Sequence, residues 1–292
     1  MRKHFAETVI GIAKADDRCR VLLGDIGVHS FRELFDESPS SILNIGILEQ
    51  AMIGVAAGMA MDNRIPIVHS IAPFLVERCL EQLKVDFAYQ GLSGKFVSVG
   101  SSFDYSALGC THHCPSDVAN LLAIPDFQIV VPGTGAEFSQ LFSETYENGS
   151  NTYYRLSETS HSHDVAVKFG EVSVVRRGRR GVLVAVGPLL SLALEASQDL
   201  DVSLVYLTTI SPFDYEGLRR ATETPRIFVL EPFYEGTLTH LISKSFPDSD
   251  HSVRCKGVPR TFLYKYGTRD EHMVNIGFDS RTLHFEIQRF FS

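Results

Sequence analysis

Residues 44–61 read NIGILEQAMIGVAAGMAM, with one acid, Glu49, at the head of a run that is almost wholly apolar and small. No charge occurs between residues 51 and 61, where Ala, Gly and Met are interspersed with Ile and Val. The run predicts a helix that is apolar on all sides. Such a helix is normally buried, either in a large core or against another chain.

Glu49 in the first turn of this helix has two interpretations. A carboxyl group in an apolar wall is favoured in its protonated form, which can donate a hydrogen bond and suits a heteroaromatic ring nitrogen. A Glu in the first turn is also favoured simply by the helix dipole. The helix alone leaves both interpretations open.

The composition is that of an ordinary globular protein. The chain has 292 residues, 44% of them hydrophobic and 21% charged, which is enough for about two domains. A net charge of −8 and the lack of a basic stripe with interleaved aromatics argue against a nucleic-acid partner. The apolar runs are too short or too rich in Gly for a membrane span, and the charged start is unlike a signal peptide. The five cysteines follow no disulfide pattern, so we expect a cytoplasmic protein.

Strand-like apolar runs alternate with helical patterns along the chain. The predicted strands are 20–23, 66–69, 95–100, 128–131, 152–156, 171–176, 181–186, 202–206 and 226–230. The predicted helices are 5–15, 49–61, 74–89, 116–123, 137–146, 191–198, 215–221, 237–245 and 280–291. This alternation predicts an α/β protein with two domains, 1–160 and 170–292, each a mainly parallel sheet flanked by helices.

Several motifs follow one another in a distinctive order. The first half contains N-I-G-I-x-E-Q at 44–50, A-P-F-L-x-x-R-x-x-E-Q at 72–82, G-x-T-H at 109–112 and Y-x-R-L at 153–156. The second half contains GPLLSLALEA at 187–196, TISPFD at 209–214 and FVLEPFYEGTL at 228–238. Together they resemble the C-terminal half of transketolase, especially the small subunit of split, two-chain transketolases, which use thiamine diphosphate. The resemblance covers nearly the whole chain and implies a pyrimidine-binding domain of the thiamine-diphosphate-binding fold, followed by a transketolase C-terminal domain.

The resemblance also implies roles for five residues. Glu49 matches the catalytic glutamate that contacts N1′ of the cofactor's pyrimidine, and Phe74 matches the aromatic residue that stacks on this ring. His112 matches a histidine that faces the substrate and handles protons there. Arg2 and Arg155 match positions that hold the phosphate of a sugar phosphate, a role suited to the bidentate guanidinium. The alternatives are a core role for Phe74 and ordinary surface roles for the two arginines.

The spelling GCTHHC also invites a metal-site interpretation, because Cys110 and Cys114 flank His112 and His113. A structural zinc site usually needs a second pair of ligands, and no obvious pair occurs elsewhere. We therefore expect no metal ligand in this chain.

Two departures from the family pattern bear on substrate and partner. The acid expected two residues before Cys110 is replaced by Leu108, and the histidine expected near Gly100 is absent; Asp104 is a candidate replacement. An unusual acceptor sugar is therefore expected. The Gly-Asp-Gly motif that holds Mg²⁺ and the diphosphate is also missing, since GDIG at 24–27 lacks the second Gly in place.

The missing motif predicts a partner chain. We expect an N-terminal-half transketolase subunit to supply the diphosphate site and most of the Mg²⁺ ligands, in an α2β2 assembly that also contains two copies of this chain. The predicted function is transfer of a two-carbon ketol unit from a ketose phosphate to an aldehyde. The alternatives are the β subunit of a 2-oxo acid dehydrogenase or of a 1-deoxyxylulose-5-phosphate-synthase-like enzyme, and a non-catalytic, transketolase-like regulatory subunit.

Overall fold

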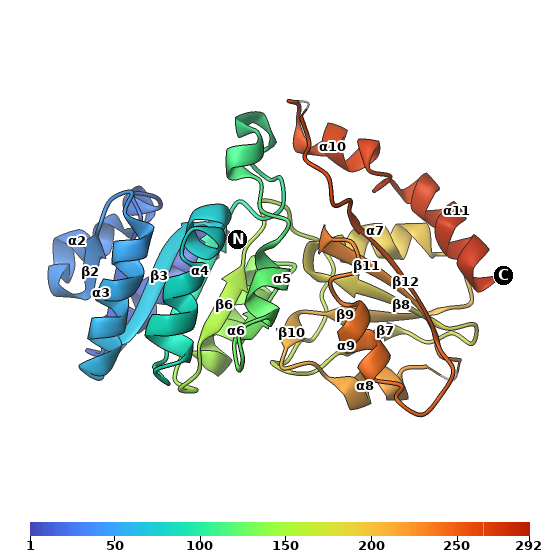
Figure 1. Cartoon of the computed structure of the whole chain (residues 1–292), viewed down its shortest axis with the longest axis horizontal. Helices are drawn as coiled ribbons and strands as arrows, with labels where there is room; N and C mark the ends of the chain where they lie inside the picture. Colours follow the sequence, from blue (N-terminus) through green and yellow to red (C-terminus); the bar gives the residue numbers. More distant parts are fainter. Residues whose placement is uncertain (223, 265) are drawn as a thin grey trace.

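The computed structural model describes residues 1–222, 224–264 and 266–292, which form two mainly parallel sheets flanked by helices (Figure 1). The fold class predicted from the sequence is therefore confirmed. The first sheet has the order β10-β5-β6-β4-β3-β1-β2 and the second the order β12-β11-β8-β9-β7. Only the edge strands β10 and β7 run antiparallel to their neighbours within the described ranges.

The strands lie close to the predicted ranges. In the first sheet they are β1 (Cys19–Leu23), β2 (Ile42–Asn44), β3 (Ile65–Ile71), β4 (Lys95–Val99), β5 (Gln128–Val130), β6 (Thr152–Arg155) and β10 (Thr209–Ser211). In the second sheet they are β7 (Ser173–Arg176), β8 (Val182–Val186), β9 (Ser203–Leu207), β11 (Arg226–Tyr234) and β12 (Ser252–Val258). The sequence did not predict β2, β10 and β12, because two of them have three residues and the third mixes charged with apolar positions.

The helices cover both faces of each sheet. The first half contains α1 (Arg2–Ala15), α2 (Arg32–Glu37), α3 (Glu49–Met61), α4 (Leu80–Gln82), α5 (Asp117–Leu122) and α6 (Gly135–Thr145). The second half contains α7 (Leu190–Ala196), α8 (Tyr215–Arg220), α9 (Thr239–Lys244), α10 (Arg269–Asn275) and α11 (Ser280–Phe291). The single helix predicted at 74–89 is instead α4 between two wider, π-type segments, Pro73–Glu77 and Leu83–Ala88. Among the described residues, no helix has the length and hydrophobicity needed to cross a bilayer.

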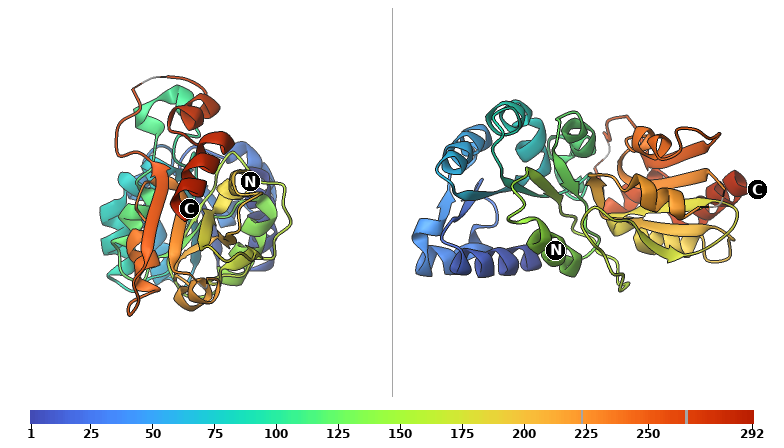
Figure 2. Two further views of the ribbon diagram at one scale, coloured as in Figure 1. Left: turned by 90° about the vertical axis from the view of Figure 1, so that its right-hand side faces the viewer. Right: turned by 90° about the horizontal axis from the view of Figure 1, so that it is seen from below.

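Alternation along the strands decides which helices share a core. Val21 and Leu23 of β1 face α1 and α6, whereas Leu22 packs in the core of α3 and the segments after β3. Figure 2 shows these helices on opposite faces of the first sheet. Helix α3 and the Pro73–Glu77 segment share one core and therefore lie on the same face of the sheet. They follow the carboxyl ends of β2 and β3, respectively.

Helix α3 has the predicted bounds but is not buried on all sides within this chain. Met52 and Ile53 are inaccessible, whereas Val55 is 39% and Met61 66% exposed. Ile47 and Leu48, just before the helix, are 67% and 62% exposed. The apolar run therefore faces the core on one side and leaves an apolar surface on the other.

The second half of the chain contributes to the first sheet. Strand β10 pairs with β5, with Thr209 opposite Val130, and the Val131 N–H donates to the Thr208 carbonyl over 2.7 Å. Close by, the Tyr206 hydroxyl donates to Glu137 over 2.7 Å. Burial raises the pKa of Tyr206, so this hydroxyl keeps its proton. The two halves are thus joined by a shared sheet and a buried polar contact.

Candidate functional site

The carboxyl ends of neighbouring parallel strands bring the predicted site residues to one edge of the first sheet. Strand β2 leads through a short loop to Glu49 at the start of α3, and β3 leads directly to Pro73 and Phe74. Strand β4 leads into residues 100–116, which contain His112 and stand beside α10 (Figure 1). Ligand clefts of α/β proteins lie at this edge.

Glu49 is buried and has two partners. Its side chain is 1% exposed. The Ser70 hydroxyl, on β3, donates to Oε1 over 3.0 Å, and Nη1 of Arg78 donates to Oε2 over 2.6 Å. The predicted burial is confirmed, but the wall around the carboxyl group is not purely apolar, because it holds a cation.

Phe74 connects this ion pair to His112. The guanidinium carbon of Arg78 lies 4.2 Å from the centroid of the Phe74 ring, a cation–π geometry. The His112 ring meets Phe74 edge-on, with 5.2 Å between the centroids. The structure therefore brings Glu49, Phe74 and His112 together, with Arg78 as the link.

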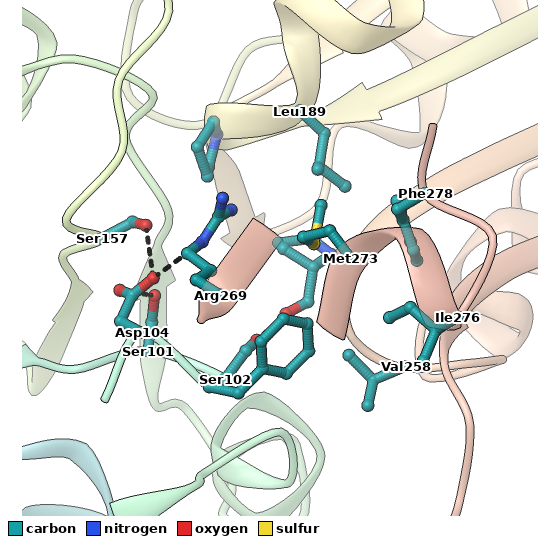
Figure 3. Close-up of a pocket in the computed structure, with 13 residues that line it drawn as sticks. Ser101, Ser102, Asp104, Ser157, Leu189, Val258, Arg269, Met273, Ile276 and Phe278 are labelled. Atoms are coloured by element: carbon teal, nitrogen blue, oxygen red, sulfur yellow. Dashed lines mark hydrogen bonds and ion pairs between the residues drawn. The ribbon is translucent and has the colours of Figure 1, made fainter. Parts of the chain in front are cut away.

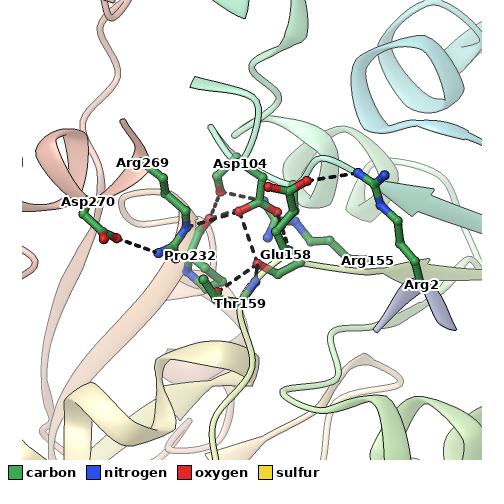
Figure 4. Close-up of polar contacts among 11 residues, drawn as sticks. Arg2, Asp104, Arg155, Glu158, Thr159, Pro232, Arg269 and Asp270 are labelled. Atoms are coloured by element: carbon green, nitrogen blue, oxygen red, sulfur yellow. Dashed lines mark hydrogen bonds and ion pairs between the residues drawn. The ribbon is translucent and has the colours of Figure 1, made fainter. Parts of the chain in front are cut away.

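Arg2 lies at the other end of the same series of contacts. The Tyr105 ring is 6.3 Å from His112, and the guanidinium of Arg2 lies over Tyr105 at 5.4 Å. Arg2 also donates to Glu158 over 3.0 Å, and its side chain is 47% exposed (Figure 4). Four of the five predicted residues, Glu49, Phe74, His112 and Arg2, are thus linked by one series of side-chain contacts, which we call the rim of the site.

Arg155 is the exception. Its side chain is 1% exposed, and Nε donates to Asp117, itself inaccessible, over 2.7 Å. Nη2 donates to the Ser102 hydroxyl over 2.7 Å and to the Pro232 carbonyl over 3.2 Å. These partners are protein groups on three separate segments, and Figure 4 shows Arg155 together with one of them, Pro232. The geometry favours a structural role for Arg155 and gives a phosphate no open approach to it.

Asp104 is also committed to protein partners. Its carboxylate accepts from Ser101 over 3.0 Å, from the Glu158 N–H over 3.0 Å and from Arg269 of α10 over 3.2 Å. Its side chain is 2% exposed and lines a pocket to which both halves of the chain contribute (Figure 3). Asp104 therefore ties residues 100–116 to the second half of the chain, and this geometry favours a structural role over replacement of the missing substrate-facing acid. Leu108 is 54% exposed.

The GCTHHC segment does not assemble a metal centre here. Cys110 is exposed, whereas Cys114 is buried, and burial raises the pKa of its thiol. Across 1–222, 224–264 and 266–292, no group of three or more His, Cys, Asp or Glu side chains is placed to hold a metal ion.

Comparison with known proteins identifies the family. The family model described as "Transketolase, pyrimidine binding domain" matches residues 1–160. The chain belongs to the transketolase family. It is 38% identical to a protein described as an uncharacterized 33.6 kDa protein in the fasciation locus of Rhodococcoides fascians, over 98% of this chain and 93% of that one.

Two further comparisons locate the chain within the transketolases. It is 27% identical to a subunit of the apulose-4-phosphate transketolase of Phocaeicola vulgatus, over 95% of this chain and 93% of that one. Its fold is similar to a structure titled "Split gene transketolase, inactive beta4 tetramer", with a TM-score of 0.85 at 21% identity, covering 99% and 97% of the two chains. The chain therefore corresponds to the C-terminal subunit of a transketolase.

Arg78 belongs to the group of contacts around Glu49 and Phe74, but the sequence interpretation left it without a role. A signal was present, because Arg78 is the arginine of the A-P-F-L-x-x-R motif and stands four residues after Phe74. Residues four apart on a helical turn share a face. Its contact with Glu49, 29 residues away in sequence, depends on how α3 and the Pro73–Glu77 segment are arranged.

Proposed function

We propose that this chain is the pyrimidine-binding subunit of a thiamine-diphosphate-dependent transketolase that transfers a two-carbon ketol unit from a ketose to an aldehyde. The observation that carries the proposal is the placing of a buried carboxylate, Glu49, and a half-buried aromatic ring, Phe74, around one flat cationic group. An acid and an aromatic face are what an aminopyrimidine ring needs: one binds a ring nitrogen, the other stacks on the ring plane. The residues therefore fit the cofactor.

Each residue of the rim has a part in this proposal. When bound, the cofactor supplies the electron sink for breaking and forming the carbon–carbon bond. Glu49 holds a proton at N1′ of the pyrimidine, and Ser70 fixes the orientation of its carboxyl group. Phe74 keeps the ring plane in place, and His112, next to it, moves protons at the substrate oxygens.

A partner chain is part of the proposal. The exposed apolar surface includes residues 47–48, which directly precede Glu49, and part of α3. Gly54 and Gly58 of α3 meet no atom within 4 Å of where a Cβ would stand. Exposed apolar patches of this kind mark protein contacts. We infer that a subunit carrying the diphosphate and Mg²⁺ site docks there, which places the active site between two chains. The relative titled an inactive beta4 tetramer supports the expectation that such a chain alone is inactive.

The substrate is inferred to be a sugar phosphate. The relative from Phocaeicola vulgatus is named for apulose-4-phosphate, which supports a phosphorylated substrate. Arg2 is exposed at the rim and is the better phosphate ligand, because the donors of Arg155 are used inside the protein. Leu108, exposed where an acid is expected, supports a changed pattern of hydroxyl recognition.

The test of the proposal is substitution of Glu49 in the reconstituted two-chain enzyme. Glu49→Gln should lower turnover by about 10²–10⁴-fold, since proton handling at N1′ is lost. Glu49→Ala should also weaken cofactor binding. The measurements are ketol transfer and exchange of the cofactor C2 proton followed by NMR, with Glu81→Gln, an exposed acid on α4, as the matched control. A wild-type rate of C2 proton exchange in Glu49→Ala would show that the assignment is wrong.

A further inference from the structure

The Arg78 guanidinium contacts two residues that are proposed to hold the pyrimidine. Its guanidinium stacks on Phe74 at 4.2 Å and donates an N–H to Glu49 over 2.6 Å. A guanidinium is flat, cationic and a donor of N–H groups in its own plane. An aminopyrimidine protonated at its ring nitrogen has the same three properties. We propose that Arg78 occupies the place of the cofactor's pyrimidine ring while no cofactor is bound and leaves it when the cofactor binds, an inference that rests on the proposed function.

The geometry makes the two occupants exclusive. The His112 ring meets Phe74 edge-on, at 74° between the ring planes, so it does not cover the face of the ring. The face that adjoins Glu49 is the one over which Arg78 lies. A ligand that stacks on Phe74 and also bonds Glu49 must therefore use the space that Arg78 fills. At 4.2 Å, no second flat group fits between the guanidinium and the ring.

The exposed Arg78 side chain has room to leave its position, whereas Glu49 and Ser70 are enclosed by the protein. The Arg78 side chain is 39% exposed, and within the described part of the chain this side chain hydrogen-bonds to Glu49 alone. Ser70 and Glu49, by contrast, are both about 1% exposed. While the site is free, Arg78 keeps the buried carboxylate paired, which avoids the cost of an isolated buried charge. The cofactor must displace Arg78 in order to bind. The free energy of breaking the Arg78 contacts therefore lowers the apparent affinity of the wild type for the cofactor.

The experiment is calorimetric titration of the assembled two-chain complex with thiamine diphosphate and Mg²⁺. Arg78→Met should tighten binding by roughly three- to tenfold, because no ion pair or stacked contact has to be broken. Arg78→Lys, which keeps the charge but not the flat group, should show a smaller gain. Arg32→Met is the matched control, since Arg32 is exposed on α2 and pairs there with Asp36, and the affinity of this variant should equal that of the wild type.

The outcomes separate this inference from the function on which it rests. If the wild-type complex does not bind thiamine diphosphate, the proposed function is wrong. If the wild type binds but Arg78→Met binds equally or more weakly, with an unchanged melting temperature, Arg78 does not leave the site and the displacement is wrong while the function stands. If Arg78→Met does not fold, Arg78→Lys decides, and affinity equal to or weaker than that of the wild type overturns the displacement.

Discussion

Nε of Arg155 lies 2.7 Å from Oδ2 of Asp117, and neither side chain is more than 1% exposed. The Tyr153 hydroxyl donates to the same carboxylate oxygen over 2.8 Å. Through the Pro232 carbonyl, Arg155 also reaches β11 in the second sheet. An arginine that the sequence motif suggests for substrate binding is therefore engaged in holding the two halves of the chain together.

The first prediction is that Arg155 acts on stability. Arg155→Met should lower the free energy of unfolding by about 3–5 kcal/mol, because it leaves the Asp117 charge buried and unpaired. The double variant Arg155→Met/Asp117→Leu should recover most of this loss, since no unpaired charge remains. Denaturant unfolding of the chain measures both. Normal stability of Arg155→Met, together with a raised KM for phosphorylated substrates alone, would restore the phosphate assignment.

The second prediction assigns phosphate recognition to Arg2. Arg2→Ala in the reconstituted enzyme should raise KM for a phosphorylated aldose by about three- to tenfold, the loss of a charge-assisted hydrogen bond at an exposed position. The KM for the unphosphorylated aldose should not change, and kcat should fall little. Steady-state kinetics with paired substrates measures the difference, and Arg32→Ala serves as control. Equal effects on both substrates would show that Arg2 contacts something other than the phosphate.

The third prediction concerns Lys95, which is inaccessible at the start of β4. Its ammonium donates to Asn148 and to the Ser150 carbonyl, each over 2.8 Å, and to Thr152 over 3.2 Å. Burial lowers the pKa of Lys95 to about 7, against about 10.4 in an unfolded chain. Between these values the unfolded state binds more protons than the folded state, so the free energy of unfolding should rise as pH rises from about 7 to 10.

Lys95→Met removes this titration, so its free energy of unfolding should rise less over the same pH interval than that of the wild type. Denaturant unfolding at pH 7, 8 and 9 measures the two slopes. Lys84→Met, at an exposed position of the same domain, should keep the wild-type slope. Parallel pH profiles for the wild type and Lys95→Met would contradict the lowered pKa.

Much of the fold could be predicted because it is encoded locally. The bounds of α3 and α11 agree with the predicted helices, since each has an uninterrupted helical pattern, and Asp279 caps α11 by accepting from the Thr282 N–H over 2.9 Å. The short strand β10 could not be predicted. Its three residues carry too little pattern, and it forms through pairing with β5, about 80 residues earlier in the chain.

The candidate site also has a part that the sequence could predict and a part that it could not. Glu49, Phe74 and His112 could be proposed because each lies in a short motif of the local sequence; Glu49 starts a helix, Phe74 closely follows a strand, and His112 ends a short turn within residues 100–116. The partners of the charged groups could not. Asp104 and Arg269 are 165 residues apart in sequence, and their ion pair exists only because residues 100–116 stand beside α10.

The sequence by itself determined the alternation of strands and helices, the acid at the head of an apolar helix and the order of motifs that marks a transketolase. Only the tertiary structure decided with which group each arginine pairs and how far it is exposed. Arg78 lies on the ring expected to hold the pyrimidine, Arg155 is enclosed with Asp117, and Arg2 remains exposed. The physical reason is that helical and strand periodicity is a property of neighbouring residues, whereas the burial and pairing of a charge depend on segments that meet only in the folded chain.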